Sequence, residues 1–161
     1  MRIRPATEMD CPRIAEIWNP IIRDSHATFN AEAKTVDGLV EDLCAKARQN
    51  HPFLVAEQDQ VLGFATYGQF RASSGYRHTM EHTIILAPEA RGQGVGRRLM
   101  AAIEQHAALC KVHSLFAGVS NRNPEGVAFH AALGYDEVAR LKEVGWKFDQ
   151  WYDLVLMQKI L

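Results

Sequence analysis

The sequence lacks any long apolar segment. No stretch of the 161 residues approaches the ~20 consecutive apolar residues that a membrane-spanning helix needs. The first residues, Met1–Thr7, also lack the apolar core of a secretory signal peptide. We therefore expect a cytoplasmic protein with no membrane partner.

An excess of charge of one sign is also missing. The 18 Lys and Arg residues balance 19 Asp and Glu residues, which leaves a formal net charge of −1. Such a chain has no general electrostatic attraction to nucleic acid or to an anionic membrane surface, so we expect neither as a partner. Its length and its 47% hydrophobic content suit a single domain over residues 1–161.

Cysteines are few. Cys11, Cys44 and Cys110 are odd in number and follow neither a Cys-x-x-Cys nor a metal-ligand spacing. We interpret them as reduced, buried thiols without chemistry, and we expect no metal site.

A glycine-rich turn in mid-chain joins a predicted strand to a predicted helix. Residues 83–86 are apolar and mostly β-branched, which indicates a buried strand, and Pro88 ends it because proline has no N–H for a strand ladder. From Val95 onward, apolar residues such as Leu99 and Ile103 recur at the spacing of an amphipathic helix.

The turn itself, residues 91–97, reads Arg-Gly-Gln-Gly-Val-Gly-Arg. The first N–H groups of a helix have no internal partner and carry the positive end of its dipole, so this turn can bind an anion such as a pyrophosphate. A P-loop would end in Gly-Lys-Ser/Thr, and a dinucleotide fingerprint would read Gly-x-Gly-x-x-Gly in a βαβ unit. The spacing matches neither.

The remaining periodicity predicts a mixed α/β fold (α+β, with a mixed sheet) in the order β-α-α-β-β-β-α-β-α-β-β. Pro20 predicts a kink or an early end in the first helix. The helix after residues 81–87 makes that strand parallel to the next one, with a right-handed crossover. The expected strands cover residues 2–4, 53–57, 61–67, 81–87, 113–119, 135–144 and 151–159. The expected helices begin after Asp10, at Thr35 or Asp37, at Val95 and at Asn123. We expect a loop at residues 145–150, between the last two strands.

Residues 91–96 resemble the acetyl-CoA pyrophosphate loop, Arg/Gln-x-x-Gly-x-Gly/Ala, of the GNAT superfamily of N-acetyltransferases. The element order also resembles the GNAT fold over nearly the whole chain. In that family two central parallel strands splay apart, and the pantetheine arm of acetyl-CoA lies between them. The resemblance assigns these places to residues 81–87 and 113–119.

A second GNAT motif, Asn-x-x-Ala-x-x-x-Tyr-x-x-x-Gly-Phe, resembles the stretch that begins at Asn123. Gly126 replaces the alanine and Tyr135 the phenylalanine. His130 stands where many members place a tyrosine thought to protonate the leaving thiolate, which leaves the general acid open.

Residues 75–82 and 143–157 look like one GNAT branch, the phosphinothricin and methionine sulfone/sulfoximine acetyltransferases. This resemblance implies acetyl transfer from acetyl-CoA to the primary amine of a small amino-acid-like substrate, by a homodimer. No cysteine stands beside a base, as an acyl-enzyme would require, so we expect direct attack by the amine. The implied cofactor-binding residues are Ile84, Ile85, Leu86, Arg91, Gly92, Gln93, Gly94, Val95, Gly96, Arg97 and Asn123.

Two residues are candidates for catalysis. Glu81 begins the buried strand and can act as the general base, directly or through water, although a surface or salt-bridged carboxylate is the alternative. His130 can act as the general acid or can simply be packed in the core. We interpret His78 and His82 as structural, since alternation along a strand puts His82 and Glu81 on opposite faces.

The branch resemblance also points to a substrate pocket at Phe29, Arg77 and Thr79, and the loop before Glu81 adds Arg71 and Tyr76. The alternative for Arg77 is a solvated charge at the strand end or an ion pair with Glu32. Arg77 is the first candidate for binding a substrate carboxylate, because its planar guanidinium can make two parallel hydrogen bonds. Arg71 is the second. Two other functions stay open from the sequence: an acyl-CoA sensor without turnover, and a transferase for polyamines or protein N-termini.

Overall fold

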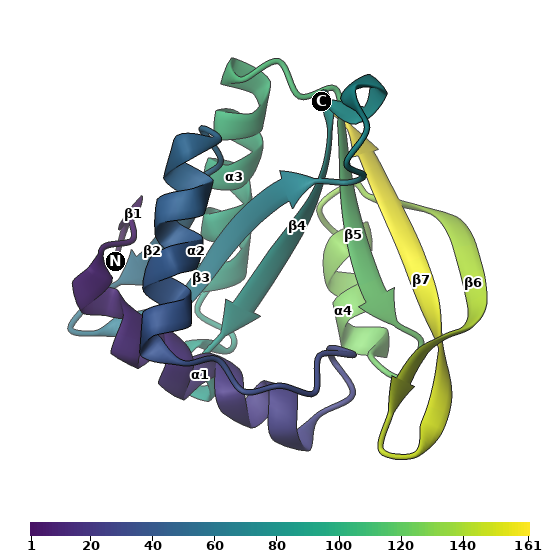
Figure 1. Cartoon of the computed structure of the whole chain (residues 1–161), viewed down its shortest axis with the longest axis horizontal. Coiled ribbons are helices and arrows are strands. Elements are labelled where there is room, and N and C mark those ends of the chain that lie inside the picture. Colours follow the sequence, from purple (N-terminus) through teal and green to yellow (C-terminus); the bar gives the residue numbers. More distant parts are fainter.

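The computed structural model describes all 161 residues and contains a seven-stranded sheet with two α-helices on each face (Figure 1). The strand order in the sheet is β1-β2-β3-β4-β5-β7-β6. The order of elements expected from the sequence is confirmed. In chain order they are β1 (Arg2–Pro5), α1 (Cys11–Asp24), α2 (Val36–Arg48), β2 (Phe53–Glu57), β3 (Val61–Gln69), β4 (Thr79–Leu86), α3 (Val95–Leu109), β5 (Ser114–Ser120), α4 (Pro124–Ala131), β6 (Asp136–Lys147) and β7 (Gln150–Ile160), with short 3-10 turns at Glu8–Asp10, Ser74–Tyr76 and Pro88–Ala90.

The two central strands, β4 and β5, are parallel and pair along only part of their length. Their register runs from Thr79 opposite Ser114 to His82 opposite Ala117 and then stops. Beyond that point β4 continues beside β3 and β5 continues beside β7, both in antiparallel pairing. The two halves of the sheet therefore diverge, and the expected splay is confirmed.

Each face of the sheet has its own core. Leu99 and Ile103 of α3 pack with Ala65 on one face, whereas Ile14 of α1 packs with Phe64 on the other. Successive strand residues point to opposite faces, so neighbours in the chain serve different cores.

The same alternation applies along β4. Met80 and Ile84 pack on the α3 side, and Ile85 packs on the α1 side. Glu81 therefore shares the α1 face with Ile85, while His82 points toward α3 and α4, as expected from the sequence.

Helix α1 does not end early at Pro20. It continues to Asp24 with Pro20 inside it. Both Pro20 and Glu16 are exposed, so water can bond the Glu16 carbonyl that the proline leaves without a partner.

The expected loop at 145–150 is wrong. Strand β6 runs to Lys147 and β7 starts at Gln150, which leaves a turn of two residues, Phe148 and Asp149, with φ of 51° and 55°. Two positive φ values define the type I′ hairpin turn, whose twist suits the flanking strands. The usual Asn-Gly signal of this turn is absent here, so the sequence pattern did not reveal it.

The expectation that all three cysteines are buried is wrong for Cys44. Cys11 is buried and Cys110 is partly buried, but Cys44 is exposed on α2, and all three are free thiols.

Among the helices, none combines the length and the apolar character needed to cross a membrane.

Candidate active site

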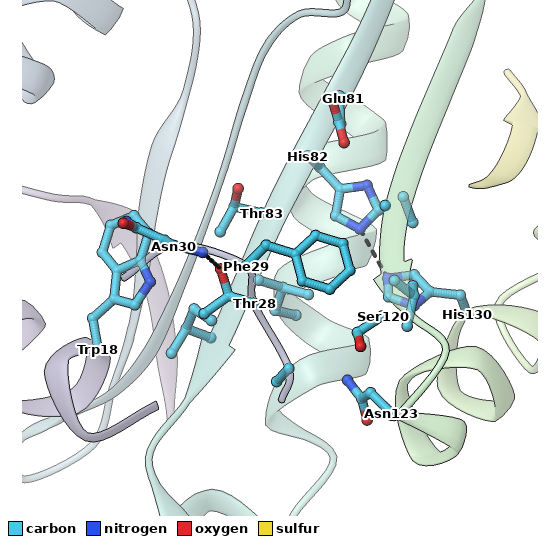
Figure 2. Close-up of a pocket in the computed structure, with 16 residues that line it drawn as sticks. Trp18, Thr28, Phe29, Asn30, Glu81, His82, Thr83, Ser120, Asn123 and His130 are labelled. Atoms are coloured by element: carbon cyan, nitrogen blue, oxygen red, sulfur yellow. Dashed lines mark hydrogen bonds between the residues drawn. The ribbon is translucent and has the colours of Figure 1, made fainter. Parts of the chain in front are cut away.

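A cavity of about 340 Å³ lies where β4 and β5 diverge. The α1–α2 loop crosses the open end of the gap between these strands (Figure 1), and Figure 2 shows its Phe29 ring between Thr83 and His130. Because five elements from distant parts of the chain line the cavity, it exists only in the folded protein. The lining residues are Trp18 of α1, Ala27, Thr28, Phe29 and Asn30 of the loop, Glu81, His82, Thr83, Ile84 and Ile85 of β4, Ala117, Gly118, Val119 and Ser120 of β5, and Asn123 and His130 at α4.

A second cavity, of about 470 Å³, lies at the N-terminus of α3. It shares Ile84, Asn123 and His130 with the first cavity, so the two spaces meet at these side chains. The members of the predicted cofactor set that line it are Ile84, Leu86, Arg91, Gly92, Gly94, Val95, Gly96, Arg97 and Asn123. Ile85 lines the first cavity instead, and Gln93 lines neither, because its Nε2 donates to the Glu89 carbonyl at 2.6 Å.

The backbone of the glycine-rich turn suits a pyrophosphate. Gly92 and Gly94 have φ of 72° and 73°, a conformation that favours glycine, and a Cβ at either would meet no atom within 4 Å. Gly94 caps α3, so the open space lies in front of the first N–H groups of that helix. The turn therefore offers both room and hydrogen-bond donors to an anion.

Gly96, which also lines the second cavity, has a packing role as well. It lies within α3, and a Cβ there would come within 3.0 Å of the Phe129 ring and 3.2 Å of Leu86. Its small size lets the first turn of α3 pack against α4 beside the cavity.

Glu81 forms no hydrogen bond or ion pair with another side chain, which excludes the salt-bridged alternative. Burial raises the pKa of its carboxyl, because a charged carboxylate loses solvation in the cavity wall. Its Oε1 lies 2.7 Å from where a Cβ on Gly118 would stand. A partly buried carboxylate without a cation partner is available to take a proton.

His82 and His130 form a buried pair, drawn as a dashed line in Figure 2, with their Nε2 atoms 3.0 Å apart. His130 Nδ1 lies 2.7 Å from the Gly126 carbonyl, which can only accept, so Nδ1 carries a proton. In a neutral His130 ring Nε2 then accepts, and the donor is His82 Nε2–H. The sequence did not reveal this pair, because its members lie 48 positions apart.

The pair is neutral near neutral pH. Burial lowers the pKa of His82 to about 3, with a further contribution from the nearby His130, and burial also lowers the pKa of His130. Both protons of the neutral pair are already used in hydrogen bonds. His130 can therefore donate to a thiolate only when the pair holds an additional proton, which burial opposes.

Of the predicted substrate residues, the structure brings only Phe29 into the first cavity. Arg77 is exposed and its Nε donates to His78 Nε2 at 3.1 Å. Thr79 lies two residues before Glu81 on the same face of β4. Arg71 and Tyr76 lie in the loop that precedes β4, outside the cavity lining.

An aromatic stack links that loop to Glu81. Phe70 stacks on Phe116 with ring centroids 4.6 Å apart, and Phe116 lies opposite Glu81 in the strand register. The Arg71 guanidinium lies 5.5 Å from the Phe70 ring centroid, and the Tyr76 ring 6.3 Å from it. Sequence reasoning missed Phe70 and Phe116, because nothing in their local patterns distinguishes them from core residues.

Comparison with known proteins agrees with this geometry. The family model described as an acetyltransferase (GNAT) domain matches residues 3–156. The chain belongs to the GNAT family, and its activity is that of an acetyl-CoA-dependent N-acetyltransferase.

Similar proteins come from several bacteria. A phosphinothricin N-acetyltransferase of Alcaligenes faecalis is 36% identical over 99% of this chain and 82% of its own length. An L-methionine sulfoximine/L-methionine sulfone acetyltransferase of Salmonella typhimurium is 33% identical over 98% of this chain and 93% of its own. The crystal structure of a ribosomal-protein-alanine N-acetyltransferase from Brucella melitensis superposes with a TM-score of 0.96 at 40% identity, with full coverage of both chains.

The space beside Glu81 leads to a first prediction. In Gly118→Ala the new methyl group would lie 2.7 Å from Glu81 Oε1, which is the movable end of a side chain, so we expect the protein to fold and the Glu81 carboxylate to shift. Because misplaced catalytic groups lose much of their effect, we expect turnover to fall about a hundredfold. Steady-state kinetics with a melting curve will measure this. Gly75→Ala is the control, since its Cβ would lie 3.9 Å from the nearest side chain. Equal turnover in both variants would contradict the placement of Glu81.

Proposed function

We propose that this protein acetylates the primary amine of a small amino-acid-like substrate, of the phosphinothricin, methionine sulfoximine or methionine sulfone type. One observation carries the proposal: the anion-binding turn of α3 and the cavity at Glu81 meet at Ile84, Asn123 and His130. A thioester held along β4 would then have its acetyl group beside an unpaired carboxylate. Acetyl-CoA supplies this activated acetyl group.

The residues of β4 support direct attack. The Glu81 carboxylate takes a proton from the substrate ammonium, and the amine forms the new C–N bond as the C–S bond breaks. The second proton of the attacking nitrogen then passes to water or to the leaving thiolate. Strand β4 leaves β5 after His82, so the alternate N–H groups from Thr83 to Leu86 that face the gap have no strand partner. These groups can stabilise the oxyanion, and no side chain is needed for that role. The thiolate leaves either unprotonated or with a proton from a charged His82–His130 pair.

The shape of the cavity favours a small amine over a protein N-terminus. The α1–α2 loop closes one side of the space, with the Phe29 ring and Asn30 among its lining residues. A protein substrate would need an open groove across this region. The similarity to the Brucella melitensis protein keeps an alanine N-terminus as the second candidate.

We infer that a carboxylate of the substrate binds an arginine of the β3–β4 loop. Arg71 has the better support, because it lies against the Phe70 ring. Phe70 stacks on Phe116, and Phe116 lies opposite Glu81 in the pairing of β4 with β5. Arg77 remains the alternative, although its Nε is directed to His78. An arginine here would select amino acids over simple amines.

We propose that the protein works as a cytoplasmic homodimer. Acetyl-CoA is made and used inside cells, and free thiols suit a reducing compartment. The edge hairpin β6–β7 exposes several large apolar side chains, and such concentrations favour contact with a second copy. They are Val138, Leu141, Val144, Trp146, Phe148 and Trp151, each at least 40% exposed.

The dimer has a direct test. Trp146 and Trp151 lie opposite each other with ring centroids 4.9 Å apart, and their exposed fractions are 51% and 56%. We expect light scattering to report a dimer at micromolar concentration for the wild type and a monomer for Trp146→Glu, since a buried charge without a partner is costly. A monomeric wild type would contradict the proposal.

Replacement of the proposed base gives a second test. Glu81→Gln keeps the size of the side chain but cannot accept the proton, so we expect acetyl-CoA binding to persist and turnover to fall roughly a hundredfold or more. In the wild type, turnover will decline as the pH falls through the raised pKa of Glu81, because only the ionised form is a base. Near-normal turnover of the variant from mildly acidic to mildly alkaline pH would show that the amine loses its proton elsewhere.

A panel of amines tests the substrate class. Methionine sulfoximine, methionine sulfone and phosphinothricin would be compared with their decarboxylated amines and with an alanine-initiated peptide, in wild type, Arg71→Ala and Arg77→Ala. We expect the wild type to prefer the free amino acids and Arg71→Ala to lose that preference. A preference for the peptide would favour the second candidate function, and equal rates on acids and bare amines in the wild type would rule out carboxylate recognition.

A further inference from the structure

The ammonium group of Lys147 is placed unusually for a lysine. Lys147 ends strand β6, yet its residue surface is only 5% exposed. No carboxylate forms an ion pair with it, and burial lowers its pKa, opposed only by the nearby charge of Asp24. A lysine rarely stays buried unless its donors are satisfied, so its contacts need an explanation.

Its partners are backbone carbonyls of the α1–α2 loop. Nζ donates to the Ser25 carbonyl at 2.8 Å and to the Thr28 carbonyl at 2.9 Å. It also lies 5.0 Å from the centroid of the Phe148 ring, where a cation is attracted to the aromatic face. Two carbonyls and one ring thus account for the three N–H groups of the ammonium.

The same hairpin contacts the loop at two further places. The Phe29 ring rests on Gly145, where a Cβ would come within 2.5 Å of its carbon atoms, and it stacks on Tyr152 with centroids 5.9 Å apart. His26 packs edge-on against Phe148 with centroids 5.2 Å apart. Gly145 and Lys147 both face the loop because they are two residues apart on one strand, whereas Trp146 between them faces outward.

The loop held in this way lines the amine cavity. Ala27, Thr28, Phe29 and Asn30 line it. Ser25, the first Lys147 contact, lies two residues before this segment, and the second contact is made by Thr28 itself.

Within residues 25–30 the other hydrogen bonds are local, such as Asn30 N–H to Thr28 Oγ1 at 3.1 Å. These short-range bonds shape this part of the loop, but they do not fix its position relative to the cavity. The far end of the loop is attached to α1, because Lys34 N–H donates to Asn19 Oδ1 at 2.7 Å and Asn19 Nδ2 donates to the Lys34 carbonyl at 3.0 Å.

We propose that Lys147 is a positioning residue: by binding the Ser25 and Thr28 carbonyls, it holds Phe29 against the cavity and so sets the fit of the amine substrate. The inference rests on the proposed function, because it assigns the cavity at Glu81 to the amine. Lys147 touches neither substrate nor acetyl-CoA in this role. The far hairpin of the sheet thereby determines one wall of the active site.

The first test measures the loop itself. Hydrogen exchange of peptides covering residues 25–31 would be compared in wild type, Lys147→Met and Lys142→Met. Methionine keeps the apolar stem but removes the ammonium, and Lys142 is the matched control because it is an exposed lysine on the same strand. We expect exchange in the loop to quicken about tenfold only in Lys147→Met, as two hydrogen bonds to a charged group are lost, with α3 peptides unchanged. Unchanged loop exchange in Lys147→Met would overturn the proposal.

The second test separates positioning from general structure. With methionine sulfone and phosphinothricin, KM for the amine should rise about tenfold in Lys147→Met while kcat and KM for acetyl-CoA stay close to the wild type. Gly145→Ala should also raise KM for the amine, because it displaces the Phe29 ring without touching Lys147. Faster loop exchange with unchanged KM for the amine would overturn the link to substrate fit. A wild type that acetylates no amine of the panel would contradict the proposed function, and the exchange measurement would still decide whether Lys147 holds the loop.

Discussion

The rest of the structure depends on the point where the parallel strands β4 and β5 stop pairing. Hydrogen bonding ends at His82 opposite Ala117, so the strands separate while each keeps its antiparallel neighbour. The separation leaves strand N–H groups without partners, opens a cavity inside a sheet that would otherwise be continuous, and connects it to the N-terminus of α3. A regular sheet of the same strands would satisfy its backbone and would have no place for a thioester.

Burial then determines how the titratable groups behave around that opening. Glu81 is enclosed without a cation, which raises the pKa of its carboxyl and makes it a better base. Burial lowers the pKa values of His82 and His130. In the neutral pair, one ring proton lies in the hydrogen bond between the two histidines, and the other is donated by His130 to the Gly126 carbonyl. The chain therefore places one carboxylate without an ion-pair partner in the cavity, beside a histidine pair that burial keeps neutral.

Glycines shape the site for separate reasons. Gly94 adopts a positive φ in front of the α3 donors, whereas Gly118 leaves room for the Glu81 carboxylate and Gly145 for the Phe29 ring. At Gly126 a Cβ would lie 2.5 Å from Asn123 Nδ2, so the departure from the alanine of the family motif matches the position of that side chain. At Gly118, Gly126 and Gly145 an added methyl group would displace a neighbouring side chain, whereas at Gly94 it would meet no protein atom and would strain the backbone instead.

The sequence by itself determined the order of the elements and the glycine-rich turn before α3, because hydrophobic period, proline and glycine are local signals that act within a few residues. Residues 91–97 and the cap at Asn123 were recognisable for that reason, and Glu81 was recognisable from a family resemblance. The tertiary structure alone decided which distant groups meet. Examples are the pairing of His82 with His130, the stack of Phe70 on Phe116, and the hydrogen bonds from Lys147 to the α1–α2 loop. It also gave different neighbours to Arg71 and Arg77, which look alike in the sequence: Arg71 lies against the Phe70 ring, and Arg77 donates to His78. The hairpin turn at Phe148 also depends on tertiary structure. The twist of two long paired strands stabilises it, whereas its own residues do not favour it, so the local sequence did not predict it.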